Sequence, residues 1–579
     1  MSHPLRAVMA VVAALLFLSL GHGLPQRYVP DDHAVKCALG MARDLGAGQM
    51  GALAALVPPS GQYTTYPYLL PYADLAAISA TFAAGRLTGR WHGAAEFAEA
   101  VFDDPGIAWF AARVVSALLT LLLPYACYRA ARSLQWTPGR AALAALLAGS
   151  SLLVVQYAHT ERPWAPLTAF GACALWGALR LAEHRRARDV VFAAVAAALS
   201  ASTHPVGALF FGVVALAALA WRPRWPALAA GLAAGLLVVL CVGYPYLLVY
   251  RADTGRGMIA GQLDAGAPVD IGGQAFDLSA LGGKLAVPIA RAWFGYDPVL
   301  LAVGLMGLVG VWRTRRDGVR WVLCLPPLGI AVLFLVYDGS HVRYLLPATP
   351  FLALGAAWAL GELASARMEL RRTRRALAAL ALALPLVQAA RLDLVLGRED
   401  TRTQAARELP ALIGPHELVC LDGYGPPLEP TAASVRTLKP LVWINRQEER
   451  VLEREGAGVP EPGHARALLP ISRFWKYDSY YPTDYVAGAG PLAFGDFLRA
   501  WHVACYVQVD RQPDEERRAP VTAWNAAHGR LVYELSPTGR TPPSEAALPT
   551  DMAFALVQLW RYDRPGPWIR CWRYAPGGA

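Results

Sequence analysis

The sequence of 579 residues is 55% hydrophobic and only 17% charged, with a mean hydropathy of +0.33. This composition excludes an ordinary soluble enzyme of that size and indicates a protein of the lipid bilayer. The net charge of +10 does not indicate nucleic-acid binding. The arginines cluster in short loops between apolar runs, where membrane proteins carry them for topology.

Apolar runs long enough to cross about 30 Å of hydrocarbon recur up to about residue 391, and none follows. We therefore expect a polytopic α-helical membrane domain at residues 1–392 and a soluble domain at residues 393–579. The runs predict about eleven transmembrane helices. These are expected near residues 7–23, 106–126, 141–157, 163–181, 189–203, 206–221, 227–249, 298–312, 321–337, 343–364 and 376–391.

Arginine-rich loops indicate the orientation of these spans. Loops such as the one with Arg185 and Arg186 follow alternate spans and should face the cytoplasm. The loops between them hold few cations and should lie outside, together with the long loops 24–105 and 250–297. The first span carries Arg6 before its apolar core but no clean cleavage site, which favours a retained anchor. We expect a multi-pass protein of the cytoplasmic (inner) membrane with its N-terminus inside and its C-terminal domain outside.

The eight cysteines indicate no metal site. They form no CxxC pair, and none stands at a spacing from histidine that is typical of zinc ligands. Four of them would lie on the oxidising side of the membrane, where one or two disulfides can form in a pairing that the sequence leaves open. These four are Cys37, Cys420, Cys505 and Cys571.

Two paired carboxylates, Asp31 and Asp32, follow the first span just outside the expected bilayer. One interpretation is a helix cap, because proline followed by aspartate is a good helix start. However, the third span ends in AHTERP, which places His159, Glu161 and Arg162 at the same membrane face. Ionisable groups at a membrane boundary cost solvation energy unless they are paired or hydrated, so this combination predicts a functional site.

Two further outer loops add basic and aromatic side chains to that face. The motif STHP contributes His204, and HVRYLLP contributes His341, Arg343 and Tyr344. Taken singly, Arg343 is explained by snorkelling at a helix end and Tyr344 by an interfacial aromatic belt. Taken together with the carboxylates, the set predicts glycosyl transfer from a lipid-linked sugar phosphate. One carboxylate would activate the acceptor while cations hold the leaving phosphate.

The expected location restricts the sugar donor. Nucleotide sugars are not expected outside the cytoplasmic membrane, so the sugar would arrive on a carrier that is anchored in lipid. In agreement, the sequence contains no Walker loop of the kind that binds nucleoside triphosphates.

The ordered set of motifs resembles the GT-C glycosyltransferases, and within them the family 39 branch of protein O-mannosyltransferases and aminoarabinose (lipid A) transferases. Members begin with one span and an outer loop that opens with an acidic pair, here Asp31 and Asp32. They often carry a short acidic motif at the end of the third span, here around Glu161, and an R-Y-x-x-P start to a late span, here from Arg343. The resemblance covers the whole membrane part and implies the GT-C fold.

The resemblance also implies roles for individual residues. Asp31 would be the general base, with Asp32 or Glu161 orienting the acceptor, and Arg343 would meet the donor phosphate. The remaining candidates are His204 or Lys284 as phosphate helpers, and Tyr344, His159, Arg162, Tyr66 and Tyr68 as substrate contacts. Loop 24–105 would supply juxtamembrane helices around the site. Many relatives have Glu at the position of Asp32 and Lys in the STHP region, so the choice of base and the contact at His204 are left open.

The C-terminal part mixes short β-like runs with turn-rich stretches, which predicts a small α/β or α+β domain outside the membrane. We expect it to select the acceptor or to close the active-site cavity, without catalytic residues of its own. The expected partners are a polyprenyl-phosphate sugar donor, an acceptor that is a protein, lipid or envelope glycan, and membrane lipids. No cofactor is assigned, and a requirement for a divalent metal is left open because the relatives differ.

Two other functions compete with the transferase. A secondary transporter or lipid-sugar flippase would also be polytopic, but it should carry polar or broken-helix features near the midplane, often in two repeated halves. This sequence has no evident internal repeat, and its notable charges fall at one membrane face. The second alternative is a non-catalytic scaffold whose C-terminal domain binds a cell-wall polymer.

Overall fold

The computed structural model describes most of the chain. The described residues are 2–26, 33–47, 51–58, 67–249, 269–271, 274–276, 281–284, 286–337, 341–365, 371–423, 425–442, 444–471, 494–510, 515–539 and 556–575. The chain divides into two compact units, Met1–Asp393 and Leu394–Ala579.

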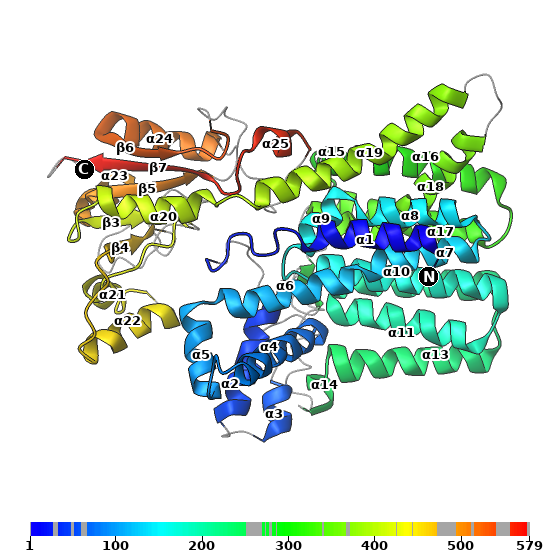
Figure 1. Ribbon diagram of the computed structural model, residues 1–579, viewed down its shortest axis with the longest axis horizontal. Helices are drawn as coiled ribbons and strands as arrows, with labels where there is room; N and C mark the ends of the chain where they lie inside the picture. Colours follow the sequence, from blue (N-terminus) through cyan, green and yellow to red (C-terminus); the bar gives the residue numbers. More distant parts are fainter. Residues whose placement is uncertain are drawn as a thin grey trace. The chain divides into compact units, whose positions relative to one another are not determined.

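The first unit is built mainly from helices, because its apolar runs are rich in alanine and leucine, which have high helix propensity. Most helices of its expected membrane spans run side by side (Figure 1). The helices of these spans are α1 (His3–Phe17), α6 (Gly106–Thr120), α7 (Leu122–Ser133), α8 (Pro138–Gly149), α9 (Leu152–Ala158), α10 (Trp164–His184), α11 (Ala187–Thr203), α12 (Leu209–Trp221), α13 (Trp225–Val238), α16 (Pro298–Thr314), α17 (Val319–Val336), α18 (Thr349–Ser365) and α19 (Arg371–Leu396).

Shorter elements connect these helices. They are the 3-10 helices η1 (Pro205–Ala208) and η5 (Val342–Ala348), the π-helix η2 (Val239–Gly243), helices α14 (Tyr246–Val249) and α15 (Ala286–Tyr296), and the antiparallel strands β1 (Val269–Ile271) and β2 (Gln274–Phe276).

Each of the eleven segments expected to cross the membrane contains a helix. By length and composition, six helices of the described part qualify as membrane spans, and up to eight qualify if two bent pairs each count as one. The bent pairs are α8 with α9 and α15 with α16. The polytopic helical membrane fold is thereby confirmed, while the number of eleven spans stays a prediction.

Helices α16 and α18 approach each other closely because glycines line their contact. A Cβ atom added to Gly307 would lie 1.7 Å from the carbonyl oxygen of Gly355, and one added to Gly304 would lie 2.8 Å from that of Leu352. Small residues that allow backbones to meet are a typical device for packing helices in a membrane. Element η5, which lies between α17 and α18, is therefore attached directly to a well-packed helix pair.

Four helices from the expected outer loop gather at one end of the long helices (Figure 1). They are α2 (His33–Ala47), α3 (Ala52–Leu56), α4 (Leu69–Leu87) and α5 (Ala94–Asp103). An apolar core joins α2, α4, α5 and α6 through Val35, Ile78, Val101 and Trp109. This core fixes α2, α4 and α5 on α6, the first long helix that follows them.

The second unit contains a mixed five-stranded sheet in the order β4-β3-β5-β7-β6. Strand β3 (Leu418–Leu421) pairs in parallel with β4 (Ala467–Pro470) and β5 (Cys505–Asp510), and β7 (Trp568–Tyr574) pairs antiparallel with β5 and β6 (Gly529–Leu535). The sheet confirms the expected α/β or α+β class of this part. Its helices are α20 (Thr401–Leu412), α21 (Ala432–Leu438), α22 (Arg446–Gly456), α23 (Phe494–Ala500), α24 (Glu515–His528) and α25 (Leu556–Arg561).

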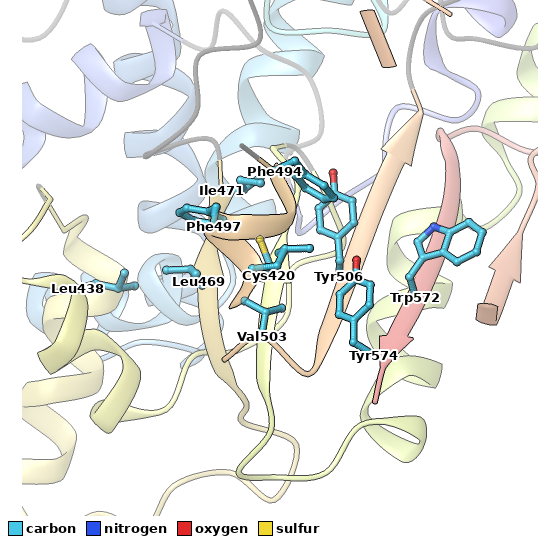
Figure 2. Close-up of a cluster of buried hydrophobic side chains, with 11 residues drawn as sticks. Cys420, Leu438, Leu469, Ile471, Phe494, Phe497, Val503, Tyr506, Trp572 and Tyr574 are labelled. Atoms are coloured by element: carbon cyan, nitrogen blue, oxygen red, sulfur yellow. The ribbon is translucent and has the colours of Figure 1, made fainter. Parts of the chain in front are cut away.

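Aromatic side chains form much of the core of the second unit. Figure 2 shows Phe494 and Phe497 of α23 near Cys420, with Tyr506 and Tyr574 on neighbouring strands of the sheet. The rings of Phe494 and Tyr506 lie 5.1 Å apart in an edge-on arrangement, which is favourable for aromatic pairs. All eight cysteines of the chain are free thiols in this structure.

Candidate functional site

The HTERP turn (residues 159–163) links α9 to α10 and is buried along its length. Glu161 and Arg162 each expose only 2% of their surface. Because a buried ion is costly unless it is paired, the partners of these side chains define the site. Of the other residues expected in the site, Asp31, Asp32 and Tyr66 lie outside the described part of the chain.

Arg113 of α6 is the ionic partner of Glu161. Its Nε atom donates to Glu161 Oε2 at 3.0 Å, and both side chains are fully buried. Its Nη1 atom also donates to the carbonyl oxygens of Leu20 and His22, at 2.8 Å and 2.7 Å. Arg113 therefore holds the HTERP turn and the segment that leads from α1 towards Asp31. Glu161 Oε1 and Arg113 Nη2 have no hydrogen-bond partner among the described residues.

A second carboxyl group, Asp74 of α4, lies within electrostatic range of Glu161. It is almost fully buried, and its Oδ2 atom has no hydrogen-bond partner in the described part of the chain. Burial, and next the charge of Glu161, raise the pKa of Asp74 well above its usual range. Asp74 also faces Cys37 of α2, whose thiol pKa is raised to about 12 by burial and by the Asp74 charge. Asp74 thus interacts electrostatically with both the HTERP turn and the helix that follows the Asp31–Asp32 pair.

His159 connects the HTERP turn to residues near the beginning and at the end of the chain segment that forms the first unit. Its Nδ1 atom lies 2.7 Å from the carbonyl oxygen of Val155, and its Nε2 atom contacts the carbonyl oxygen of Leu18. The same Nε2 atom lies 3.1 Å from Asp393 Oδ1 in α19, and Ser19 Oγ donates to the Asp393 carbonyl at 2.8 Å. The end of α1, the HTERP turn and α19 are therefore tied together at this histidine.

Trp164, the first residue of α10, brings together three of the predicted residues. We name Trp164, His204, Arg343 and Tyr344 the Trp164 cluster. The indole ring lies 4.4 Å from the His204 ring and 4.9 Å from the Tyr344 ring. The Arg343 guanidinium lies 5.5 Å from the ring centres of both Trp164 and Tyr344, within the range of a cation–π interaction. The STHP and HVRY motifs therefore meet directly beside the HTERP turn.

His204 is held in one orientation by its own loop. Its Nδ1 atom accepts a hydrogen bond from the backbone N–H of Val206 at 3.2 Å, so the neutral ring carries its proton on Nε2. Burial, and next the charge of Arg343, lower the pKa of His204 to about 3. Gly207 is required in this loop because a Cβ atom there would lie 2.2 Å from the carbonyl oxygen of Ser200. His204 is therefore a neutral hydrogen-bond donor at physiological pH.

Lys284 has an exposed side chain and follows two residues that are bound to the end of α17. The preceding residues Gly282 and Gly283 both donate to the carbonyl oxygen of Val336 at the end of α17. The segment 341–344 follows that helix, and α15, which begins just after Lys284, packs against η5. The lysine therefore lies between residues bound to the end of α17 and a helix that packs against η5.

Two other predicted residues have partners within the protein. Tyr68 is fully buried at the start of α4, and its hydroxyl donates to the carbonyl oxygen of Pro58 at 3.0 Å. The guanidinium of Arg162 lies 5.8 Å from the ring centre of Tyr157, within cation–π range. Substrate binding by these two residues stays a prediction.

Sequence reasoning missed Arg113, Asp74 and Trp164. An arginine in the middle of the apolar run 106–126 was a usable signal, since a charge inside a membrane span is a functional-site candidate by default. Asp74 and Trp164 gave no such signal, because each stands in an ordinary amphipathic or interfacial setting. Among the described residues, no group of three or more His, Cys, Asp or Glu side chains is arranged to hold a metal ion.

A comparison with known protein families matches a segment of the chain that contains part of this site. A family model described as dolichyl-phosphate-mannose-protein mannosyltransferase matches residues 95–248, about a quarter of the chain. The matched segment runs from α5 to α14 and includes Arg113, Glu161, Trp164 and His204. No curated protein matches the chain.

Two solved structures match much of the chain at low sequence identity. ArnT from Cupriavidus metallidurans bound to undecaprenyl phosphate gives a TM-score of 0.43 at 16% identity, covering 89% of this chain and 94% of that one. The oligosaccharyltransferase AglB from Archaeoglobus fulgidus, in complex with an inhibitory peptide and a dolichol-phosphate, gives 0.44 at 12% identity, covering 93% and 73%. The family match confirms over residues 95–248 the resemblance to GT-C superfamily glycosyltransferases.

Proposed function

We propose that this protein is an inverting glycosyltransferase that moves a sugar from a polyprenyl-phosphate carrier to an acceptor outside the cytoplasmic membrane. The observation that carries the proposal is the junction at Trp164. Glu161, which is paired with Arg113, precedes Trp164 by three residues, and Arg343 and His204 lie against the Trp164 ring. Carboxylates that can activate an acceptor thus adjoin cations and donors that can hold a phosphate.

Asp31 is the proposed general base, and the chain on both sides of it supports this assignment. Before it, Leu20 and His22 are bound by Arg113. After it, α2 begins at His33 and packs through Val35 on the turn of α6 that precedes Arg113. The described residues before and after the Asp31–Asp32 pair therefore both contact the helix whose arginine binds Glu161. Asp32 or Glu161 would orient the acceptor.

Arg343, with His204 and Lys284, is proposed to bind the donor phosphate. Arg343 supplies a permanent charge, and His204 supplies an N–H group from a ring that stays neutral. Lys284 is exposed beside the end of α17. Its ammonium group is therefore hydrated when no donor is bound, and it is free to contact a phosphate when one is. Because the leaving group is a phosphate monoester, these groups would bind it more strongly as the glycosidic bond breaks and negative charge develops.

The proposed reaction is a single displacement. The acceptor nucleophile forms a bond to the anomeric carbon from the face opposite the phosphate, its proton passes to the carboxylate base, and the carbon–oxygen bond to the polyprenyl phosphate breaks. Configuration at the anomeric carbon is inverted. The proposed acceptor is a protein, a lipid or an envelope glycan, and the proposed orientation puts the site and the C-terminal unit outside.

The test is a transfer assay with purified protein in nanodiscs. Radiolabelled polyprenyl-phosphate sugars would be offered with a crude envelope fraction, and the product's anomeric configuration would be determined by NMR. Transfer with inversion that is lost in Asp31→Asn or Asp32→Asn supports the proposal and identifies the base. Asp44→Asn is the matched control, because Asp44 is a carboxylate of α2, the first loop helix, that is paired with the exposed Arg43. Absence of transfer by the wild type, or retention of configuration, would contradict the proposal.

A further inference from the structure

Two helices of the first unit are broken, and the breaks meet. The axis bends by 58° between α8 and α9 and by 104° between α15 and α16. At the first break, Ser151 precedes α9, and at the second break, Asp297 precedes α16. Sequence reasoning did not single out either residue.

The carboxylate of Asp297 caps the short helix α9 of the other broken pair. Its Oδ1 atom accepts from the backbone N–H of Leu152 at 2.8 Å, and its Oδ2 atom accepts from Ser151 Oγ at 2.8 Å and from the N–H of Leu153 at 3.2 Å. The next free amide, that of Val154, donates to Ser151 Oγ at 3.3 Å. The first N–H groups of a helix have no partner within the helix, and their positive end favours an anion. Asp297, which is 4% exposed, supplies acceptors for these groups.

Helix α9 is a short helix that connects this cap to the HTERP turn. It has seven residues, so its length is about 10 Å at 1.5 Å per residue. Its far end is fixed by His159, which bonds to Val155 and contacts Leu18. A helix this short gains little stability from its own hydrogen bonds, so its position depends on the contacts at its two ends. The cap at Asp297 is therefore one of the two end contacts that set the position of α9 and of the HTERP turn that follows it.

Asp297 itself belongs to the part of the fold that carries the proposed phosphate groups. It ends α15, with its N–H donating to the carbonyl oxygen of Trp293 at 3.3 Å. Helix α15 begins after Lys284 and packs against α17 and η5, the element that holds Arg343 and Tyr344. The contact between Asp297 and Ser151 is therefore a link between the cationic and the carboxylate sides of the site.

We propose that Asp297 is a positioning residue that holds Glu161 of the HTERP turn in register with Arg343 of the Trp164 cluster. The assignment of a catalytic role to those two residues rests on the proposed function. Asp297 acts through α9 and does not itself contact the substrate. Its replacement should disturb the alignment of acceptor and donor more than the affinity for the donor.

The test compares Asp297→Asn with a matched control, Asp189→Asn. The amide that replaces the Asp297 carboxylate offers one acceptor oxygen, so at least one bond to α9 is lost while size and shape are kept. Asp189 is equally buried and is paired with Arg180 at 2.8 Å, but it lies in the first turn of α11, at the end opposite to His204. We expect Asp297→Asn to lower kcat by on the order of 10- to 100-fold, with the KM for the donor nearly unchanged. Asp189→Asn should leave kcat per folded molecule within about twofold, as a substitution away from the site.

Hydrogen exchange supplies a readout that does not depend on activity. In Asp297→Asn, the amides of residues 152–163 should exchange faster than in the wild type, whereas in Asp189→Asn they should not. If exchange and kcat are both unchanged in Asp297→Asn, the positioning role is refuted. If the wild type transfers no sugar but exchange over 152–163 rises in Asp297→Asn alone, the link from Asp297 to Glu161 stands and the proposed function fails.

Discussion

Replacing Arg113 gives a prediction whose magnitude follows from the structure. Arg113→Met removes the buried partner of Glu161 and two hydrogen bonds to the carbonyl oxygens of Leu20 and His22. An ion left buried without its partner costs about 3–5 kcal/mol. The two carbonyl oxygens add a smaller loss, about 1–3 kcal/mol for each one that stays buried without a donor. We expect the single variant to lose at least about 3 kcal/mol of unfolding free energy.

The double variant Arg113→Met with Glu161→Leu separates these two contributions. It removes both charges, and replacement of a whole buried pair by apolar residues is often neutral or stabilising. We expect it to recover the part due to the unpaired carboxylate and to keep the loss at the two carbonyl oxygens. Neither variant should transfer sugar.

The assay is denaturant titration in mixed micelles, with the wild type, both variants and Glu161→Leu alone, so that the coupling energy between the two positions is obtained from a double-mutant cycle. A single variant that loses less than about 1 kcal/mol, the usual range of an exposed pair, would refute the buried ion pair. A double variant less stable than Arg113→Met would refute the reasoning on the unpaired charge.

Three further predictions concern packing, pH and the Trp164 cluster. Gly307→Ala should lower stability by about 1–3 kcal/mol, because the added Cβ atom clashes with Gly355. Gly329→Ala should not lower it, because a Cβ atom there meets nothing within 4 Å. Thermal unfolding measures the stability of both variants. The pKa of Asp74 is raised in the folded state. Its contribution to stability is therefore complete below the pKa of about 4 that it has in the unfolded chain, and it is lost as the pH rises through its folded-state pKa. Unfolding temperatures from pH 4.5 to 8 should therefore fall more steeply in the wild type than in Asp74→Asn, and parallel profiles would contradict this. Trp164→Phe weakens the contact with Arg343 by about 1 kcal/mol and should raise the donor KM about fivefold in the transfer assay; an unchanged KM would separate Trp164 from the donor.

Much of the fold could be predicted because helix formation in the membrane part is a local property of the sequence. The apolar runs, and the prolines and glycines that interrupt them, predict a helix in every expected span. The structure has a helix in each of them. Two features could not be predicted in this way. The bends at Ser151 and Asp297 depend on a contact between segments that are 146 residues apart, and the count of spans depends on how such bent pairs are treated.

The candidate site was predictable to the extent that its residues stand in recognisable motifs. Glu161, His204, Arg343 and Tyr344 were found from their outward loops, and the structure brings the last three together on Trp164. Their partners were not found, because the role of Asp74 or Trp164 is defined only by what packs against it. His159 illustrates the same limit, since its ring contacts backbone carbonyl oxygens and Asp393, a bonding pattern that no spacing in the sequence indicates.

The most direct test of the transferase is a measurement on sealed proteoliposomes that contain the purified wild-type protein and a radiolabelled polyprenyl-phosphate sugar, with an envelope acceptor outside. Our account predicts that label becomes joined to the acceptor, and that this transfer is lost in Glu161→Gln and in Asp31→Asn while both variants remain folded. Label that crosses the sealed bilayer without joining an acceptor, equally in the wild type and in both variants, would contradict the account and identify a lipid-sugar flippase instead.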